Sequence, residues 1–402
     1  MADRKSIACK ELVDKVKDSD GYGFLRELVQ QVLQEALEAE RDEHVGVGKY
    51  ERGDERRDIR SGYKPREITT GVGRLSLQAP QTRNGMSSQI LASYSRVDQA
   101  VLLMASEMYV SGVSTRRVEK LLEATIGTGV SAQTVSKAAK RLDGAINALR
   151  ERPLGETPVL MVDARFDKVR RDGAVRNCAL LVVIGIDAEG YRRVLDFSAV
   201  DGEKKQHWKD LFTGLRKRGL RGVLYTVSDD HEGLRNALGE VFVGAVWNRC
   251  HTHINRNIIG ATPKKHKGEV VLHLKDIFSA PDEKEARARL LKLARKADGM
   301  KCGLGAYIEE VVPDGFGAFA VPASLRQQLR TTNMLERLNQ EIKRRTRVAR
   351  IFPSTDSYVR LAGSILVRTD EEWQAAGRKY LDTELLIEAL EEKTQTIKKQ
   401  VA

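Results

Sequence analysis

The stretch at residues 222–234, GVLYTVSDDHEGL, decides how the second half of this chain folds. It begins as a short apolar run rich in β-branched residues, which predicts a buried strand, and it ends abruptly in Ser228, Asp229 and Asp230. A strand that delivers carboxylates at its C-terminal end is how many α/β folds build a metal or phosphate site. The run at 159–162 leads in the same way into Asp163. Two such carboxylates could share a pair of divalent ions, an arrangement that suits chemistry at phosphodiester bonds.

The segments between and around these acids predict an ordered series of elements. Strands are expected at 158–167, 177–187, 191–200 and 222–228, with a helix at 203–218 before the last of them. Three strands, a helix and a further strand is the order of an RNase H-like α/β core, in which the helical crossover sets the fourth strand parallel beside the first. Asp163 and Asp229 would then be neighbours. Residues 232–329 read as an all-helical insertion into that core.

A third acid lies on a predicted helix at 331–352, TTNMLERLNQEIKRRTRVARIF, which Pro353 ends. Leu335, Leu338 and Ile342 form its buried stripe, whereas Glu336 lies off that stripe with Asn333 on the same side. Asp163, Asp229 and Glu336 thus supply three carboxylates for two metal ions. The last turns of this helix are strongly basic and are candidates for contact with DNA: Lys343, Arg344, Arg345 and Arg347.

Four further side chains are candidate supporting groups. Asp230 competes with Asp229 as a ligand, but strand alternation points the two to opposite faces, and we favour Asp229. His231 follows the acids and could orient a phosphate or an aspartate. In WNRCHTHINRN, Cys250 and His253 invite a zinc site, yet no second pair completes a tetrahedron, so packing and hydrogen bonding near the active site is the favoured role.

The first 150 residues have a different character. Periodicity predicts an amphipathic helix at 24–44, then an arginine-rich stretch of glycine-interrupted loops, then a strand at 74–80 that stops at Pro80. Helices at 114–122 and 132–142, joined by a glycine turn at 127–130, are typical of a helix-turn-helix, although such pairs also occur in proteins that bind no DNA. Candidate DNA-binding residues here are Arg56, Arg57, Arg60, Lys64, Arg116, Lys137, Lys140 and Arg141.

Length, charge and cysteine content set the broad class. The 402 residues carry 68 Lys and Arg against 56 Asp and Glu, a net charge of +12, which favours an anionic partner such as nucleic acid. Four scattered cysteines and the lack of a signal sequence or a long apolar run predict a cytoplasmic protein with no membrane segment. Expected domains are 1–95 (N-terminal helix and arginine-rich segment), 96–150 (helix-turn-helix region) and 151–402 (catalytic domain).

At these motifs the chain closely resembles the Mutator-type bacterial insertion-sequence transposases of the insertion sequence 256 family, which are DDE recombinases. The resemblance rests on VDARFDKVR around Asp163, VSDDHEGLRNAL around Asp229, NRCHTHINRN, and TTNMLERLNQEIKRRTRVARIFPS around Glu336. It implies that the three acids are catalytic and bind two Mg²⁺ ions, with Mn²⁺ as a substitute. The family usually has glycine where this chain has Asp230.

The resemblance also implies the substrate and the partners: double-stranded DNA with terminal inverted repeats, target DNA, and a homodimer that pairs two ends. Two alternatives stay open on the residues alone. One is a DNA-binding regulator with an inactive RNase H-like body, and the other is a nuclease or resolvase of the same fold that hydrolyses DNA without joining it.

Overall fold

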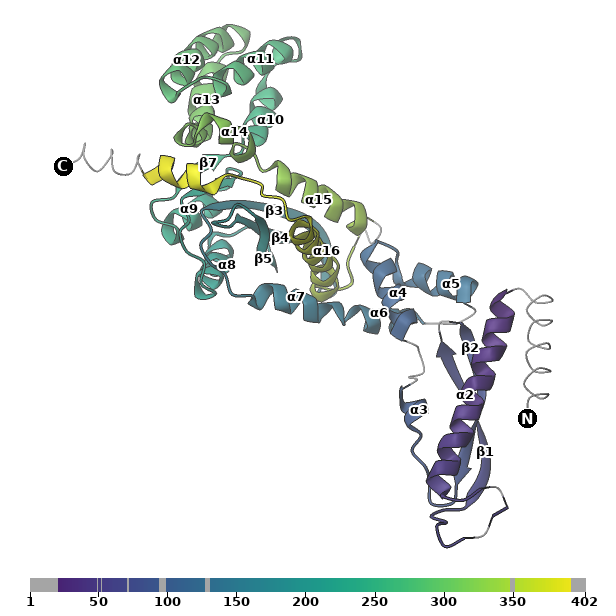
Figure 1. The fold of residues 1–402 in the computed structure, drawn as a ribbon. Coiled ribbons are helices and arrows are strands. Elements are labelled where there is room, and N and C mark those ends of the chain that lie inside the picture. The colour runs from purple at the N-terminus through teal and green to yellow at the C-terminus, as the bar shows by residue number, and fades with distance from the viewer. Residues whose placement is uncertain are drawn as a thin grey trace. The chain divides into compact units, whose positions relative to one another are not determined.

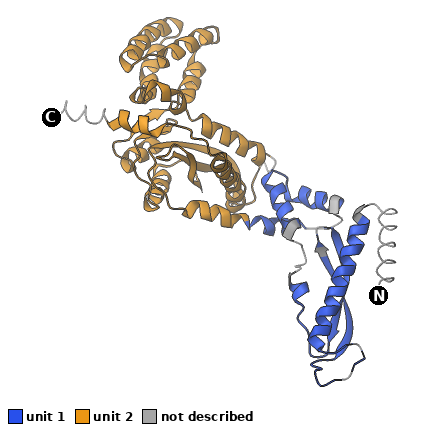
Figure 2. Ribbon diagram, in the orientation of Figure 1, with its two compact units in different colours: residues 1–141 blue, residues 142–402 orange. Residues whose placement is uncertain are grey.

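A computed structural model describes residues 21–48, 50–51, 53–70, 72–93, 99–126, 131–347 and 351–391. The chain separates into two compact units, residues 1–141 and residues 142–402 (Figure 2). No helix in the described ranges combines the length and the apolar character that a membrane crossing requires.

The first unit begins with helix α2 (Gly21–Val45), which packs on a hairpin of β1 (Arg60–Thr70) and β2 (Gly73–Thr82). Leu37 of the helix and Leu75 and Leu77 of β2 are buried in one cluster, as the predicted helix and strand require. Two expectations were wrong in detail. Part of the arginine-rich stretch is the strand β1, and β2 continues past Pro80, which pairs with β1 in a two-stranded sheet that tolerates the missing N–H.

The rest of this unit is helical: α3 (Gln89–Ser93), α4 (Gln99–Val110), α5 (Thr115–Ile126) and α6 (Ala132–Ala139). Val118 and Leu122 of α5 pack against Val135 of α6 in a small core. Ser131 caps α6 as predicted, because its hydroxyl accepts a hydrogen bond from the Thr134 amide at 3.2 Å. The predicted glycine turn at 127–130 lies outside the described residues.

The second unit is built on a mixed sheet of five strands in the order β5-β4-β3-β6-β7. Its strands are β3 (Val159–Arg171), β4 (Ala174–Ile186), β5 (Arg192–Val200), β6 (Tyr225–Ser228) and β7 (Val246–Arg249). Strand β4 is antiparallel to both β3 and β5, whereas β6 runs parallel to β3 and β7 parallel to β6. The sequence missed β7, and β3 does not end near Asp163: it continues to Arg171 because β4 pairs with its whole length.

Helices cover both faces of the sheet (Figure 1). Helices α8 (Lys205–Lys217) and α9 (Glu232–Val241) bury Trp208, Phe212 and Leu234 against Leu160 and Val162 of β3. Helices α7 (Leu142–Glu151) and α16 (Thr355–Ala376) lie against β5. A Cβ on Gly363 of α16 would lie 2.6 Å from the Phe197 ring, so glycine is what allows this close approach.

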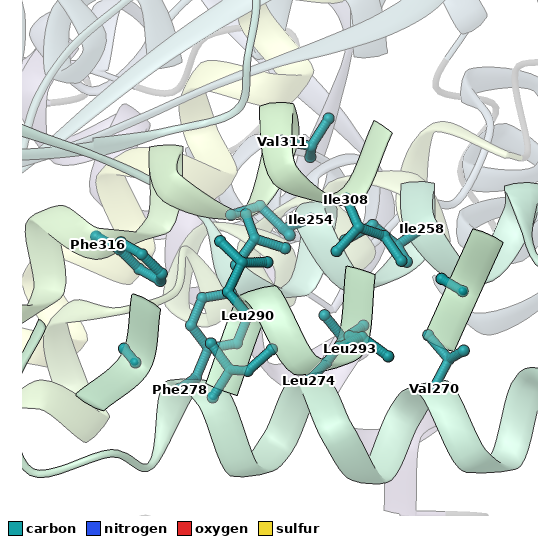
Figure 3. Close-up of a cluster of buried hydrophobic side chains, with 14 of the residues drawn as sticks. Ile254, Ile258, Val270, Leu274, Phe278, Leu290, Leu293, Ile308, Val311 and Phe316 are labelled. Atoms are coloured by element: carbon teal, nitrogen blue, oxygen red, sulfur yellow. The ribbon is translucent and has the colours of Figure 1, made fainter. Parts of the chain in front are cut away.

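A separate helical subdomain follows β7. It comprises α10 (His251–Ala261), η1 (Lys264–His266), α11 (Lys267–Phe278), α12 (Glu283–Met300), α13 (Leu304–Val311), η2 (Val312–Ala320) and α14 (Ala323–Leu329). Its side chains form their own hydrophobic core, in which Ile254, Leu274, Leu290 and Ile308 meet (Figure 3). This core identifies the predicted insertion, but it begins at α10, because α9 packs on the sheet.

Helix α15 (Asn333–Thr346) returns the chain from this subdomain to the sheet. It buries Leu335, Leu338 and Ile342, the predicted stripe. The prediction that the helix runs to residue 352 was wrong. Phe352 is extended and pairs with β3: its carbonyl accepts from the Arg170 amide at 2.8 Å, and its amide donates to the Lys168 carbonyl at 2.9 Å. Residues 383–391 form the last described helical turns.

Candidate active site

Asp163 and Asp229 occupy equivalent positions on neighbouring parallel strands. Met161 of β3 pairs with Val227 of β6, and each aspartate lies two residues further along its strand direction. Asp163 sits within β3, opposite Val182 of β4, whereas Asp229 follows the last residue of β6 directly. The parallel register therefore puts both carboxylates at the same edge of the β3–β6 pair.

The Asp163 carboxylate is held by two donors. Its Oδ1 accepts from the Ala164 amide at 2.9 Å, and its Oδ2 accepts from Nδ2 of Asn339 at 2.8 Å. Burial raises the pKa of Asp163 to about 6, and the nearby charges of Asp229 and Glu203 act in the same direction, whereas His253 opposes them. Asp163 therefore lies among other acids without enough positive charge to balance them.

His253 of α10 lies between the other two predicted acids. Its Nδ1 is 3.7 Å from Oδ1 of Asp229, and its Nε2 is 3.6 Å from Oε1 of Glu336. A hydrogen bond with Cys250 is the largest influence that raises the pKa of His253, and the charge of Asp229 adds to it against the effect of burial. A protonated imidazole at this position would carry the charge opposite to that of both carboxylates.

Cys250 supports this histidine. Its Sγ accepts hydrogen bonds from the amide and the hydroxyl of Thr332, each at 3.3 Å. Burial acts to raise the pKa of Cys250, but hydrogen bonds from His253 and Thr332 outweigh it and the pKa is lowered. These contacts agree with the packing and hydrogen-bonding role that the sequence favoured over a zinc site for Cys250 and His253.

Glu336 projects from α15 toward α10. Besides His253, its Oε1 lies 3.5 Å from Arg256, yet this buried oxygen has no hydrogen-bond donor among the described residues. The helix is fixed to β3 by Arg165, which donates to the Asn339 carbonyl at 2.9 Å. Within the described ranges, no three His, Cys, Asp or Glu side chains are grouped so that they could hold a metal ion, since the imidazole lies between Asp229 and Glu336.

Asp230 has a partner of its own. Arg249, at the end of β7, contacts Oδ2 of Asp230 at 2.9 Å and Oδ2 of Asp314 at 3.5 Å, while its Nε is 4.0 Å from Asp229. The Arg249 side chain is only 5% exposed, so its charge acts in a partly dry environment. The positive charge of Arg249 therefore balances the negative charge of Asp230.

Two site residues escaped the sequence analysis. Burial raises the pKa of Glu203, and the charge of Asp229 adds to the rise. Its Oε1 accepts from Nε1 of Trp208 at 3.3 Å and lies 3.7 Å from Nδ1 of His231. No local pattern marks it. Asn339 had a signal, because it lies three residues after Glu336 and so on the same helix side. Asn333, the predicted residue, instead accepts from Thr252 at 3.4 Å.

The predicted DNA-binding residues fall into two groups. Several form hydrogen bonds or ion pairs within the protein: Arg57 donates to the Glu43 carbonyl, and Arg60 pairs with Asp42 at 2.9 Å. Arg344 and Arg345 both pair with Glu341. The pKa of Glu341 falls to about 2, chiefly through the Arg344 hydrogen bond. The Arg56 Nε donates to the Asp58 carbonyl at 3.3 Å. The others present exposed side chains: Lys64, Arg116, Lys137, Lys140, Arg141, Lys343 and Arg347.

Comparison with known sequences identifies the class of protein as a transposase. The family model described as "Transposase, Mutator family" matches residues 1–376, which is most of the chain. The chain therefore belongs to the Mutator family of transposases.

Curated relatives agree over nearly their full length. The chain is 41% identical over 375 residues to the transposase for insertion sequence element ISRM5 of Rhizobium meliloti (strain 1021), covering 93% of each chain. It is 41% identical over 371 residues to the transposase for IS406 of Burkholderia multivorans, with 90% of this chain and 94% of that relative covered. It is 35% identical over 359 residues to the transposase for IS256 in transposon Tn4001 of Staphylococcus aureus, with 87% and 91% covered.

Proposed function

We propose that this transposase is a metal-dependent DDE recombinase that binds the terminal inverted repeats of its insertion sequence, cuts DNA at their ends and joins the freed ends to target DNA. One observation carries the proposal: carboxylates from two neighbouring strands and one packed helix, Asp163, Asp229 and Glu336, lie around His253. The strand order, with β3 antiparallel to β4 and parallel to β6, supports an RNase H-like core. The helix pair α5–α6, of which Ser131 caps α6, supports a helix-turn-helix.

The chemical type of these side chains suits Mg²⁺ or Mn²⁺, because hard divalent ions bind carboxylate oxygens. In addition, Oε1 of Glu336 is buried and receives no hydrogen bond from the described residues. Asp163, Asp229 and Glu336 would hold two ions once the His253 imidazole no longer lies between the last two. Bound there, the ions would acidify the attacking water and stabilise charge on the leaving 3′ oxygen.

The chain's own side chains orient and balance this chemistry. The Asn339 amide fixes the Asp163 carboxylate, and His253 lies between the carboxylates of Asp229 and Glu336. Arg256 is exposed beside Glu336 and is positioned to contact a DNA phosphate. In the first step a water oxygen attacks phosphorus and the 3′ oxygen leaves. In the second step that 3′ hydroxyl loses its proton and attacks a phosphodiester of the target, whose own 3′ oxygen leaves and is protonated, so the number of phosphodiester bonds is unchanged and no bond to the protein forms.

Cleavage of labelled element ends tests this proposal. A duplex from the terminus of the DNA element that carries the coding sequence should be nicked by the wild type with Mg²⁺ and then joined to a second duplex. Glu336→Gln should abolish both products and retain binding in a gel shift. Glu283→Gln is the matched control, since this exposed carboxylate pairs with Arg287 on the surface of α12. It should leave both products unchanged.

The same assay separates the alternatives. Nicked DNA without joined product would identify a hydrolytic nuclease or resolvase. Binding of the ends without any nicking by the wild type would identify a DNA-binding regulator with an inactive body. We further propose that two copies pair two element ends, which sedimentation of the chain with and without the end duplex tests.

A further inference from the structure

A second pocket lies beside the candidate active site, with a volume of about 620 Å³. It is lined by Arg192 of β5, by Gln328 of α14, by residues of the first turns of α15, and by Trp373 and Tyr380 at and beyond the end of α16. Glu336 of α15 faces His253, whereas its neighbour Arg337 lines this pocket. The two sites therefore use different faces of the same helix.

Arg192 is the central side chain of the pocket. Its guanidinium carbon lies 4.8 Å from the centre of the Trp373 ring and 5.2 Å from that of Tyr380. Its Nε is buried without a hydrogen-bond acceptor among the described residues. Oε1 of Gln328 is likewise buried without a donor there. Buried polar groups in proteins are nearly always hydrogen-bonded, so a donor and an acceptor without partners in one pocket indicate a place where a polar ligand can bind.

The charge of the pocket selects an anion. Arg192 and Arg337 line it, and Arg378 is close enough to act on the charge of Arg192. Glu341 is the acid among the lining residues, and Arg344 and Arg345 already neutralise it. The two aromatic rings add a preference for a flat group that can stack. A phosphate joined to a planar base satisfies both requirements.

The pocket is also within reach of DNA held at the active site. Asn333, one of its lining residues, accepts a hydrogen bond from Thr252, and Thr252 precedes His253 on α10. We propose that the pocket takes one unstacked nucleotide of the DNA strand that passes Glu336, with its base against Trp373 and its phosphate against Arg192 and Arg337. This inference rests on the proposed function, because it requires DNA at Glu336, and it adds a site that stabilises an unstacked base.

Tryptophan fluorescence of the full chain, titrated with oligothymidine, tests the pocket without any cleavage. The chain has three tryptophans: Trp208, which is fully buried, Trp247 and Trp373. Stacking of a base on Trp373 should quench its emission saturably, and Trp373→Phe should remove that quenching. Trp247→Phe is the matched control, because the Trp247 ring also stacks on an arginine, Arg235, at 4.5 Å. It should keep the quenching.

Affinity for the same oligonucleotide, measured by anisotropy of a labelled strand, gives a second readout. Trp373→Ala and Arg192→Gln should each weaken binding about tenfold, as expected for the loss of one stacked base or one phosphate contact. Melting temperatures show whether the variants are folded, and Trp373→Phe, which keeps an aromatic ring at this position, takes the place of the alanine variant if that one does not fold. Unchanged quenching in Trp373→Phe, or unchanged affinity in folded Arg192→Gln, would overturn the proposal that this pocket binds a nucleotide.

The two proposals fail separately. If the wild-type protein nicks element ends but shows no Trp373-dependent quenching, the nucleotide-binding proposal is wrong and the recombinase proposal stands. Wild-type protein that shows the quenching but never nicks would overturn the recombinase proposal and support the pocket.

Discussion

Two aspartates on one strand, Asp163 and Asp167 of β3, have opposite surroundings. Alternation along the strand sets them on the same face. Asp167 accepts from Nε and an Nη of Arg165 at 2.7 and 2.9 Å and from the Tyr358 hydroxyl at 2.8 Å. Asp163 accepts from an amide and from Asn339, and no Lys or Arg in the described ranges forms an ion pair with it.

The difference shows how one strand can carry a structural acid and a candidate catalytic acid. A bidentate arginine neutralises Asp167, so this carboxylate needs no further partner. Burial near other acids instead raises the pKa of Asp163, and a buried carboxylate with a raised pKa is suited to bind a cation. Activity should therefore depend on Asp163, and stability on Asp167.

The strongest test of this difference is Asp163→Asn. Nicking of a labelled element end should fall by about a thousandfold, because the variant loses a ligand charge worth several kcal/mol in the transition state. The gel-shift affinity for the same duplex should stay within about threefold, since Asp163 makes no contact with the exposed basic residues. Nicking within tenfold of the wild type would contradict the assignment.

Asp167→Asn should have the reverse effect and destabilise the second unit by about 3 kcal/mol, because Arg165 would be left buried without its counter-charge. Urea unfolding followed by tryptophan fluorescence measures this unit, since all three tryptophans lie within residues 142–402. Tyr358→Phe removes one hydrogen bond to the same carboxylate and should cost only about 1 kcal/mol. Equal losses in the two variants would argue against the ion pair as the main contribution.

The pH dependence of stability sharpens the comparison further. The pKa of Asp163 in the folded protein is about 6, against 3.8 for an ordinary aspartate, so the folded state holds this proton more tightly than the unfolded state. Its contribution is full below about pH 4 and is lost as the pH rises through about 6, a change of about 3 kcal/mol. In EDTA, the free energy of unfolding of wild type minus that of Asp163→Asn should fall across this range. A difference that stays flat with pH would refute the raised pKa.

The smallest effect is expected for Asp230→Gly, the change to the residue usual in the family. Arg249 already neutralises Asp230, so nicking should change by less than about threefold and stability by less than about 1 kcal/mol. A rise of tenfold or more in nicking would mean that this carboxylate disturbs the site in spite of its arginine.

The sequence by itself determined the local elements and the family. The apolar run before Asp163, the run before Asp229 and the stripe Leu335–Leu338–Ile342 predicted two buried strands and one helix, because such periodicity follows from backbone geometry that neighbouring residues share. The predicted placement of the fourth strand parallel beside the first also matches the sheet, in which β6 lies beside β3, although the sequence missed β7.

Only the tertiary structure decided which distant side chains meet. Periodicity says which face of α15 is buried, but not that Asn339 reaches Asp163, that His253 lies between Asp229 and Glu336, or that the Tyr358 hydroxyl donates to Asp167. It also could not show that Phe352 leaves the helix to pair with β3. Each of these contacts joins segments whose separation in the chain carries no local signal, and packing of the whole unit selects them.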